Sequence, residues 1–290
     1  MEMNEPLALC NLVIVALTAY VTYQGFEQVT FRDKLIFEPV RILRGKQYYR
    51  IVSSGFIHAD WNHFLFNMFS LYSFGSSIET FLGVPTFLFI YFAGIIGGNL
   101  LSLYLHRNHN YRALGASGGV CGVIFASIFL YPGGKINIFF IPIGIPAPVY
   151  AILFLIFSFI GMRTQLGNVG HDAHLGGSLI GLLTATILHP YILRLNPVLY
   201  LSVIFITGAL FLYAYKHPAY PQIHPPLSRT HREQAGRDLK NNFQKAERGD
   251  DEQTLDCLLD KISKEGIHSL TPSEMRKLKS LSQNRNSSRR

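Results

Sequence analysis

Residues 85–105 have the sequence PTFLFIYFAGIIGGNLLSLYL. The stretch carries no charged side chain, and a helix of about 20 apolar residues is long enough to cross the hydrocarbon core of a bilayer. We therefore predict a transmembrane helix here. Comparable stretches on both sides predict six further spans, one of them interrupted by prolines: 7–23, 61–78, 116–131, 138–162, 173–193 and 198–215. The predicted fold class is all-α, in a polytopic membrane protein.

Charge is distributed unevenly along the chain. Only 15% of the 290 residues are charged, against roughly 25% in an average soluble domain. Residues 1–215 hold 11 basic and 8 acidic side chains, whereas residues 216–290 hold 15 and 10. The first part has too little charge to cover a soluble globule, and its apolar content excludes a disordered chain. A basic tail beside membrane spans predicts contact with anionic lipid or an unknown partner rather than with nucleic acid.

The end of the chain predicts a small soluble region after a proline-rich linker, which should be extended. Apolar residues recur there at helical spacing, and Gly266 can end that helix. Thr271 and Glu274 form a capping box that predicts a second helix. The apolar positions of the first helix are Leu255, Leu258, Leu259 and Ile262.

These patterns predict three regions. Residues 1–195 are predicted to form a core of six transmembrane helices, and residues 196–216 are predicted to form a seventh transmembrane helix. Residues 217–290 form the linker and a small basic helical tail.

Three of the predicted spans carry strongly polar residues at their N-terminal ends. Spans 61–78, 116–131 and 173–193 are separated from one another by single spans, so all three enter the membrane from the same side. Polar groups inside spans are costly and are functional candidates by default. The sequence therefore predicts that three helices bring four candidates to one depth: His63, Asn67, Ser117 and His174.

Each candidate also has a purely structural interpretation. His63 and Asn67 lie four residues apart on one helix face, and either could be an interhelical hydrogen-bonding group. Ser117 alone would mean little, because serine is tolerated in any membrane helix. It lies between Gly115 and Gly118, however, and glycine permits unusual backbone angles and a close approach of another chain.

Serine chemistry needs a base that takes the hydroxyl proton and donors that stabilise the oxyanion. In this hypothesis Ser117 is the nucleophile and His174 is the base. The His63 ring, the Asn67 amide and the Ser117 N–H are the donors.

The neighbouring ionisable residues are predicted to stand outside this chemistry. His171 precedes His174 by three residues and is expected to be a solvated loop residue. Asp60 and Asp172 are the nearby acids, and neither is well placed as a third member. We therefore expect a Ser–His dyad.

Short motifs occur in a recognisable order: QYYR at 47–50, HFLFN at 63–67, GASG at 115–118 and AHLGG at 173–177. Together they resemble the rhomboid family of intramembrane serine proteases, over about two-thirds of the chain. The resemblance implies a six-helix core with a short central fourth helix. It also implies cleavage of transmembrane protein substrates without a metal or organic cofactor.

The resemblance implies a role for each matching residue. Ser117 would be the nucleophile, His174 the base, and His63 and Asn67 the lining of the oxyanion hole. Arg50 would structure the first loop. The supporting glycines would be Gly115, Gly118 and Gly177.

Two positions depart from the family pattern. Tyr49 stands where a tryptophan is common before the arginine, and Cys121 stands where an aromatic residue often stacks on the catalytic histidine. We expect these changes to modulate activity. The tail is similar to C-terminal extensions of some bacterial rhomboids, which favours a bacterial cytoplasmic membrane as the location.

Two other functions remain open from the sequence. A catalytically inactive rhomboid-like binding or quality-control factor would usually lack the serine or the histidine, and both are present here. A metal site or transporter would use the histidines of these segments, but it would need carboxylate ligands or repeated halves, which the sequence does not show. The histidines are His58, His63, His171 and His174. The three cysteines are far apart and predict neither a disulfide framework nor a metal site: Cys10, Cys121 and Cys257.

Membrane topology follows less directly. The family orientation places the N-terminus in the cytoplasm and the first loop, residues 24–60, outside. That loop holds six basic residues, and seven spans would also place the basic tail outside. The positive-inside rule favours the opposite for both. The sequence leaves the side of the tail open.

Overall fold

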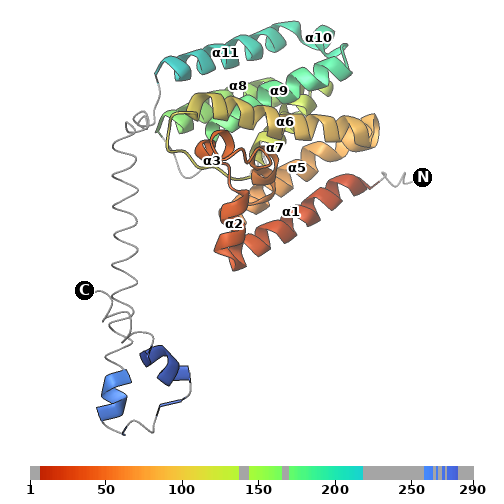
Figure 1. The fold of residues 1–290 in the computed structure, drawn as a ribbon. Coiled ribbons are helices and arrows are strands. Elements are labelled where there is room, and N and C mark those ends of the chain that lie inside the picture. The colour runs from red at the N-terminus through yellow and green to blue at the C-terminus, as the bar shows by residue number, and fades with distance from the viewer. Residues whose placement is uncertain are drawn as a thin grey trace. The chain divides into compact units, whose positions relative to one another are not determined.

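Long helices form the larger part of the protein (Figure 1). The computed structural model describes residues 7–136, 144–164, 170–217, 258–263, 266, 270–271 and 273–279. Four helices are long and apolar enough to cross a membrane, so the protein is a multi-pass membrane protein. They are α1 (Leu9–Glu27), α6 (Val84–His106), α8 (Ala147–Thr164) and α11 (Pro197–Lys216).

Three further helices complete the packed bundle. They are α5 (Trp61–Leu82), α7 (Ser117–Leu130) and α9 (His171–Leu188). α7 is short and apolar and is buried along nearly its whole length, against α5, α6 and α9. Side chains such as Val123 and Phe125 in α7 are fully buried.

Close backbone contact holds α7 against α9. A side chain at Gly177 would collide with the carbonyl of Gly118, and one at Gly181 would collide with Gly122. Only glycine lets two helices approach this closely. These four glycines therefore form the contact between α7 and α9.

The first loop folds into short helices rather than an extended chain. These are α2 (Val29–Leu35), α3 (Pro39–Leu43), α4 (Arg50–Ser53) and the 3₁₀ helix η1 (Ser54–Phe56). Figure 1 shows α2 and α3 beside the bundle.

Prolines shorten the helix in two of the predicted spans. The span predicted at 138–162 begins only at Ala147, because proline fits the first turn of a helix but not its interior. Before it, β1 (Lys135–Ile136) pairs antiparallel with β2 (Ile145–Pro146), and residues 137–143 lie outside the described part. The span predicted at 173–193 ends at Leu188, and the short helix α10 (Ile192–Leu195) follows Pro190.

A buried carboxylate joins α1 to α5. Glu79 of α5 accepts hydrogen bonds from the N–H groups of Cys10 and Asn11, at 2.8 and 2.7 Å. These are among the first N–H groups of α1, which lack carbonyl partners within their own helix. The sequence analysis had not singled out Glu79.

The chain forms two compact units, Met1–Ile223 and His224–Arg290. In the second unit residues 258–263 and 273–279 are helical. Thr271 and Glu274 form the predicted capping box, with the Thr271 N–H 2.7 Å from the carboxylate. That bond and the bond from Lys261 lower the pKa of Glu274 to about 2. The proline-rich linker and Leu255 lie outside the described residues.

Candidate active site

Ser117 is the first residue of α7 and is partly exposed. Its N–H therefore has no carbonyl partner within the helix. Gly115, two residues earlier, has a φ of 126°, which favours glycine. A Cβ at Gly115 would also lie 2.7 Å from Cε1 of His63. Glycine is therefore required at position 115 for two reasons. Its φ is positive, and a side chain there would collide with the His63 ring.

His174 lies in the first turn of α9. Within the described part of the chain, its Nε2 is buried and has no hydrogen-bond partner. The residues beside it touch the start of α7, because Gly118 lies against the Ala173 carbonyl and against Gly177. The backbone thus brings the starts of α7 and α9 together. Among the described residues, His174 Nε2 thus makes no hydrogen bond with Ser117. Hydrogen bonds between catalytic groups often tighten only when substrate binds.

The prediction that His171 is a solvated loop residue is wrong. His171 is the first residue of α9 and is 5% exposed. Its ring occupies the space that a side chain at Gly161 of α8 would need. Because Gly161 leaves this room, the ring packs inward between α8 and α9, 5.3 Å from the ring of His174.

His63 and Asn67 lie one turn apart near the start of α5. Asp60 is the N-cap of this helix, because its carboxylate accepts the His63 N–H at 2.8 Å. The Nε2 of His63 is buried without a hydrogen-bond partner among the described residues. The Asn67 side-chain nitrogen donates to the His63 carbonyl at 2.9 Å. The structure therefore places the His63 ring near the Ser117 turn and engages the Asn67 amide within α5.

His58 holds the turn before Ser117, a role that the sequence analysis did not predict. It is fully buried between η1 and α5, and its Nε2 accepts the Ala116 N–H at 3.2 Å. Burial, and then the nearby His63, lower the pKa of His58 to about 3. Neutral His58 therefore has its proton on Nδ1, which faces the Thr22 hydroxyl of α1 at 3.1 Å. The sequence signal that could have indicated this role is the position of His58, five residues before the HFLFN motif.

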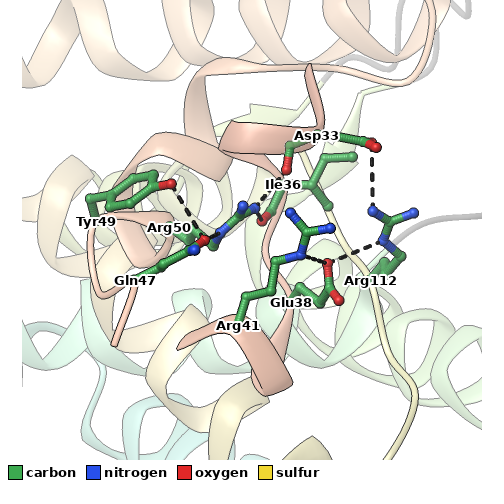
Figure 2. Close-up of polar contacts among 8 residues, drawn as sticks. All are labelled: Asp33, Ile36, Glu38, Arg41, Gln47, Tyr49, Arg50 and Arg112. Atoms are coloured by element: carbon green, nitrogen blue, oxygen red, sulfur yellow. Dashed lines mark hydrogen bonds and ion pairs between the residues drawn. The ribbon is translucent and has the colours of Figure 1, made fainter. Parts of the chain in front are cut away.

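Arg50 is buried and organises the first loop, as Figure 2 shows. It donates to the carbonyls of Asp33 and Ile36 at 2.8 and 2.7 Å and to the Gln47 side chain at 2.6 Å. Tyr49, which stands in the position of the common tryptophan, lies with its ring 5.7 Å from the Arg50 guanidinium.

The first loop also contacts the segment that leads to Ser117. Phe37 pairs with Ala113 through two backbone hydrogen bonds, of 2.9 and 3.1 Å. Arg112 lies 3.5 Å from both Asp33 and Glu38 (Figure 2). The loop therefore braces this segment from one side.

The departure at Cys121 is accompanied by an aromatic residue from another helix. Cys121 is buried in α7, and the ring of Phe154 from α8 lies 6.2 Å from the His174 ring. Phe154 also packs edge-on against Phe125 of α7, at 5.5 Å. Nothing in the sequence indicated that α8 would supply this ring.

Asp172 is buried, and its oxygens are engaged by side chains of α6 and of the segment before α7. Among the residues described by the structure, no group of three or more His, Cys, Asp or Glu side chains is arranged to hold a metal ion.

Comparisons with known proteins agree with this architecture. Residues 45–191 match the rhomboid domain, and residues 238–284 match a family of unknown function, DUF6576. The chain is 34% identical over 137 residues to rhomboid protein 1, mitochondrial, of Saccharomyces cerevisiae, covering 46% of this chain and 40% of that protein. It is 33% identical over 143 residues to the human presenilin-associated rhomboid-like protein, mitochondrial, covering 48% and 38%.

A bacterial relative is also similar. The putative rhomboid protease YdcA of Bacillus subtilis is 29% identical over 102 residues, covering 35% of this chain and 50% of that protein. The chain thus spans about half or less of the length of these relatives. The rhomboid domain nevertheless covers half of the chain, and this protein therefore belongs to the rhomboid family of intramembrane proteases.

Proposed function

We propose that this protein is an intramembrane serine endopeptidase that cleaves peptide bonds in or near transmembrane segments of membrane proteins. Ser117 is the nucleophile and His174 is the base. The observation that carries the proposal is the backbone contact of Gly118 with Ala173 and Gly177, which joins the helix starts that hold both side chains.

The chemistry follows from these positions. His174 Nε2 takes the Ser117 proton as Oγ attacks the scissile carbonyl, and it then returns the proton to the leaving amine. Water then hydrolyses the acyl-enzyme with the same base. The Ser117 N–H at the positive end of α7, the His63 ring and the Asn67 amide stabilise the oxyanion.

We propose a Ser–His dyad rather than a triad, because both neighbouring carboxylates bind other groups. Asp60 caps α5, and Asp172 is bound by Ser102 and Tyr111. The proposed chemistry uses no metal or organic cofactor.

The wider proposal includes the domains and the location. Residues 1–195 are the protease core, residues 196–216 are the seventh transmembrane helix, and residues 217–290 are the linker and tail. The tail binds an unknown partner or anionic lipid, and the protein does not bind nucleic acid. A bacterial cytoplasmic membrane is the proposed location, supported by the resemblance of the tail to bacterial extensions, although several relatives are mitochondrial.

A serine-reactive fluorophosphonate tests this function directly. The purified full-length protein should be labelled at Ser117 and should cleave a transmembrane substrate in detergent. Ser117→Ala should lose both reactions and remain folded, because a small hydroxyl at a partly exposed position contributes little packing. Ser76→Ala is the matched control, since Ser76 is an exposed hydroxyl of α5 that donates to its own helix. A wild-type protein without labelling or cleavage would instead favour an inactive rhomboid-like binding factor.

A further inference from the structure

A second polar cluster lies close to the proposed dyad but does not belong to it. Asp172, in the first turn of α9, accepts a hydrogen bond from the hydroxyl of Ser102 in α6. It also accepts one from the phenol of Tyr111 at 2.7 Å, and His106 Nε2 lies 3.3 Å from the same carboxylate. We call these four residues the Asp172 cluster. All three partners come from outside α9.

The side chains of the cluster also contact one another. The rings of His106 and Tyr111 are stacked, with centroids 3.9 Å apart and planes 8° apart. Ser102 and His106 are four residues apart, so they lie on one face of α6 and meet the carboxylate together. The other ring nitrogen of His106, Nδ1, lies 3.3 Å from Nδ1 of His109.

Stability alone is a weak explanation for such a cluster. A buried carboxylate pays a large desolvation cost, and replacing a buried polar group of this kind by apolar side chains is often neutral or stabilising. Removing one partner, by contrast, leaves other groups buried and unsatisfied. The cluster therefore acts mainly by selecting one arrangement of the segments that it joins.

Those segments are the ones that lead to the proposed catalytic residues. Asp172 precedes His174 by two residues, and Tyr111 precedes Ser117 by six. A step of two residues turns a helix by about 200°, so Asp172 meets α6 while the His174 ring lies beside Phe154 of α8. The Asp172 carboxylate accepts hydrogen bonds from Ser102 and Tyr111 with its two oxygens. It ties the start of α9 to the segment before α7.

The opposite side of that segment is fixed independently. The Gly115 N–H donates to the Ser54 carbonyl at 2.8 Å, and the Ala116 N–H donates to His58. The segment is therefore held between the first loop and α9. With its loop side fixed, a change at Asp172 would move the start of α9 relative to Ser117.

We propose that Asp172 is a positioning residue that sets the placement of His174 relative to Ser117 through the Asp172 cluster. This inference rests on the proposed Ser–His function. A misplacement of about 1 Å between reacting groups can reduce a rate by about 100-fold. Ground-state binding of a substrate should depend on this placement much less.

The test compares two buried carboxylates in the full-length protein. Asp172→Asn should lower kcat for a transmembrane substrate by about 10- to 100-fold and leave KM within about twofold. Glu79→Gln is the matched control, because Glu79 is also a buried carboxylate and holds the start of α1. It should lower the thermal midpoint and leave kcat unchanged. Equal kcat losses in both variants would show a purely structural role and overturn the proposal.

A second readout does not depend on activity. Asp172→Asn should speed hydrogen exchange at the amides of residues 171–176 and leave α5 unchanged. Unchanged exchange with wild-type kcat would overturn the proposal. If the wild-type protein takes no fluorophosphonate label, the Ser–His function fails, and exchange alone decides the positioning role. If Asp172→Asn does not fold, Tyr111→Phe must show a smaller kcat loss at unchanged KM, because it removes one donor and keeps the ring.

Discussion

At the scale of single residues, the two histidines at the start of α9 should differ in what their loss does. His174→Ala should abolish proteolysis and fluorophosphonate labelling, because the proposed base is gone. His171→Ala should lower the free energy of unfolding by about 1–3 kcal/mol, the usual range for losing a buried side chain, and the folded fraction should keep cleaving. Thermal unfolding and the rate per labelled enzyme separate the two effects. Activity that survives in His174→Ala but not in His171→Ala would move the base to His171.

Asn67 tests the oxyanion hypothesis. Asn67→Ala should lower kcat by roughly 10²–10³-fold with little change in KM, because such a donor acts mainly in the transition state. Its amide donates to the His63 carbonyl in this structure, so it must turn toward the developing charge. Asn11→Ala is the control, since that buried amide of α1 donates to Leu71 and should affect stability only. A rise in KM at constant kcat would make Asn67 a substrate-contact residue.

The sequence was informative for some of these residues and silent for others. Ser117 and His174 stand in short motifs at predicted helix starts, and the structure has both at helix starts. The proximity of Phe154 to His174 could not be predicted, because the packing of α8 against α9 sets it. The burial of His171 depends in the same way on the absence of a side chain at Gly161.

At the scale of elements, His58 links the first loop, α1 and the turn before Ser117, and this link should depend on pH. Its pKa is about 3 in the folded protein and about 6.5 in an unfolded chain. Between these values the unfolded state binds more protons, so stability falls as the pH falls through this range. The loss approaches about 1.4 kcal/mol per pH unit.

His58→Gln isolates that contribution. Glutamine offers an acceptor for the Ala116 N–H but does not titrate. The variant should therefore be less stable than wild type near pH 7.5 and should lose less stability on acidification to pH 5. Thermal midpoints in detergent at the two pH values measure the difference. An identical pH dependence in both proteins would show that His58 does not carry the effect.

The helices themselves were predictable where apolar runs end at clear signals. The run at 85–105 corresponds to α6, and the Asp60 cap starts α5 at the predicted residue. The predictions were wrong where prolines lie inside an apolar run, before α8 and after α9. A hydropathy pattern identifies the apolar run but not the helix boundaries within it. Those boundaries depend on proline, which interrupts a helix in its interior.

At the scale of the whole molecule, α1 and α11 lie outside the residues that match the rhomboid domain, 45–191. α1 nevertheless has polar contacts with the matched region, through Glu79 and through the Thr22–His58 pair. Glu79 joins α1 to α5. The Thr22–His58 pair joins α1 to the turn before Ser117, because His58 also accepts the Ala116 N–H. We therefore expect α1 to stabilise the packed helices, although the family match begins after it.

The second unit should be dispensable for catalysis. None of the proposed catalytic residues lies in His224–Arg290, and this unit contains the separate match at residues 238–284. A protein ending at Lys216 should therefore fold and cleave a transmembrane substrate in detergent at a rate within about twofold of the full chain, because its packed helices and hydrogen bonds around Ser117 are intact. Cleavage rate, helicity and size exclusion measure this. Loss of cleavage by a truncated protein that is still helical and monodisperse would assign residues 217–290 a part in the active enzyme and move the domain boundary.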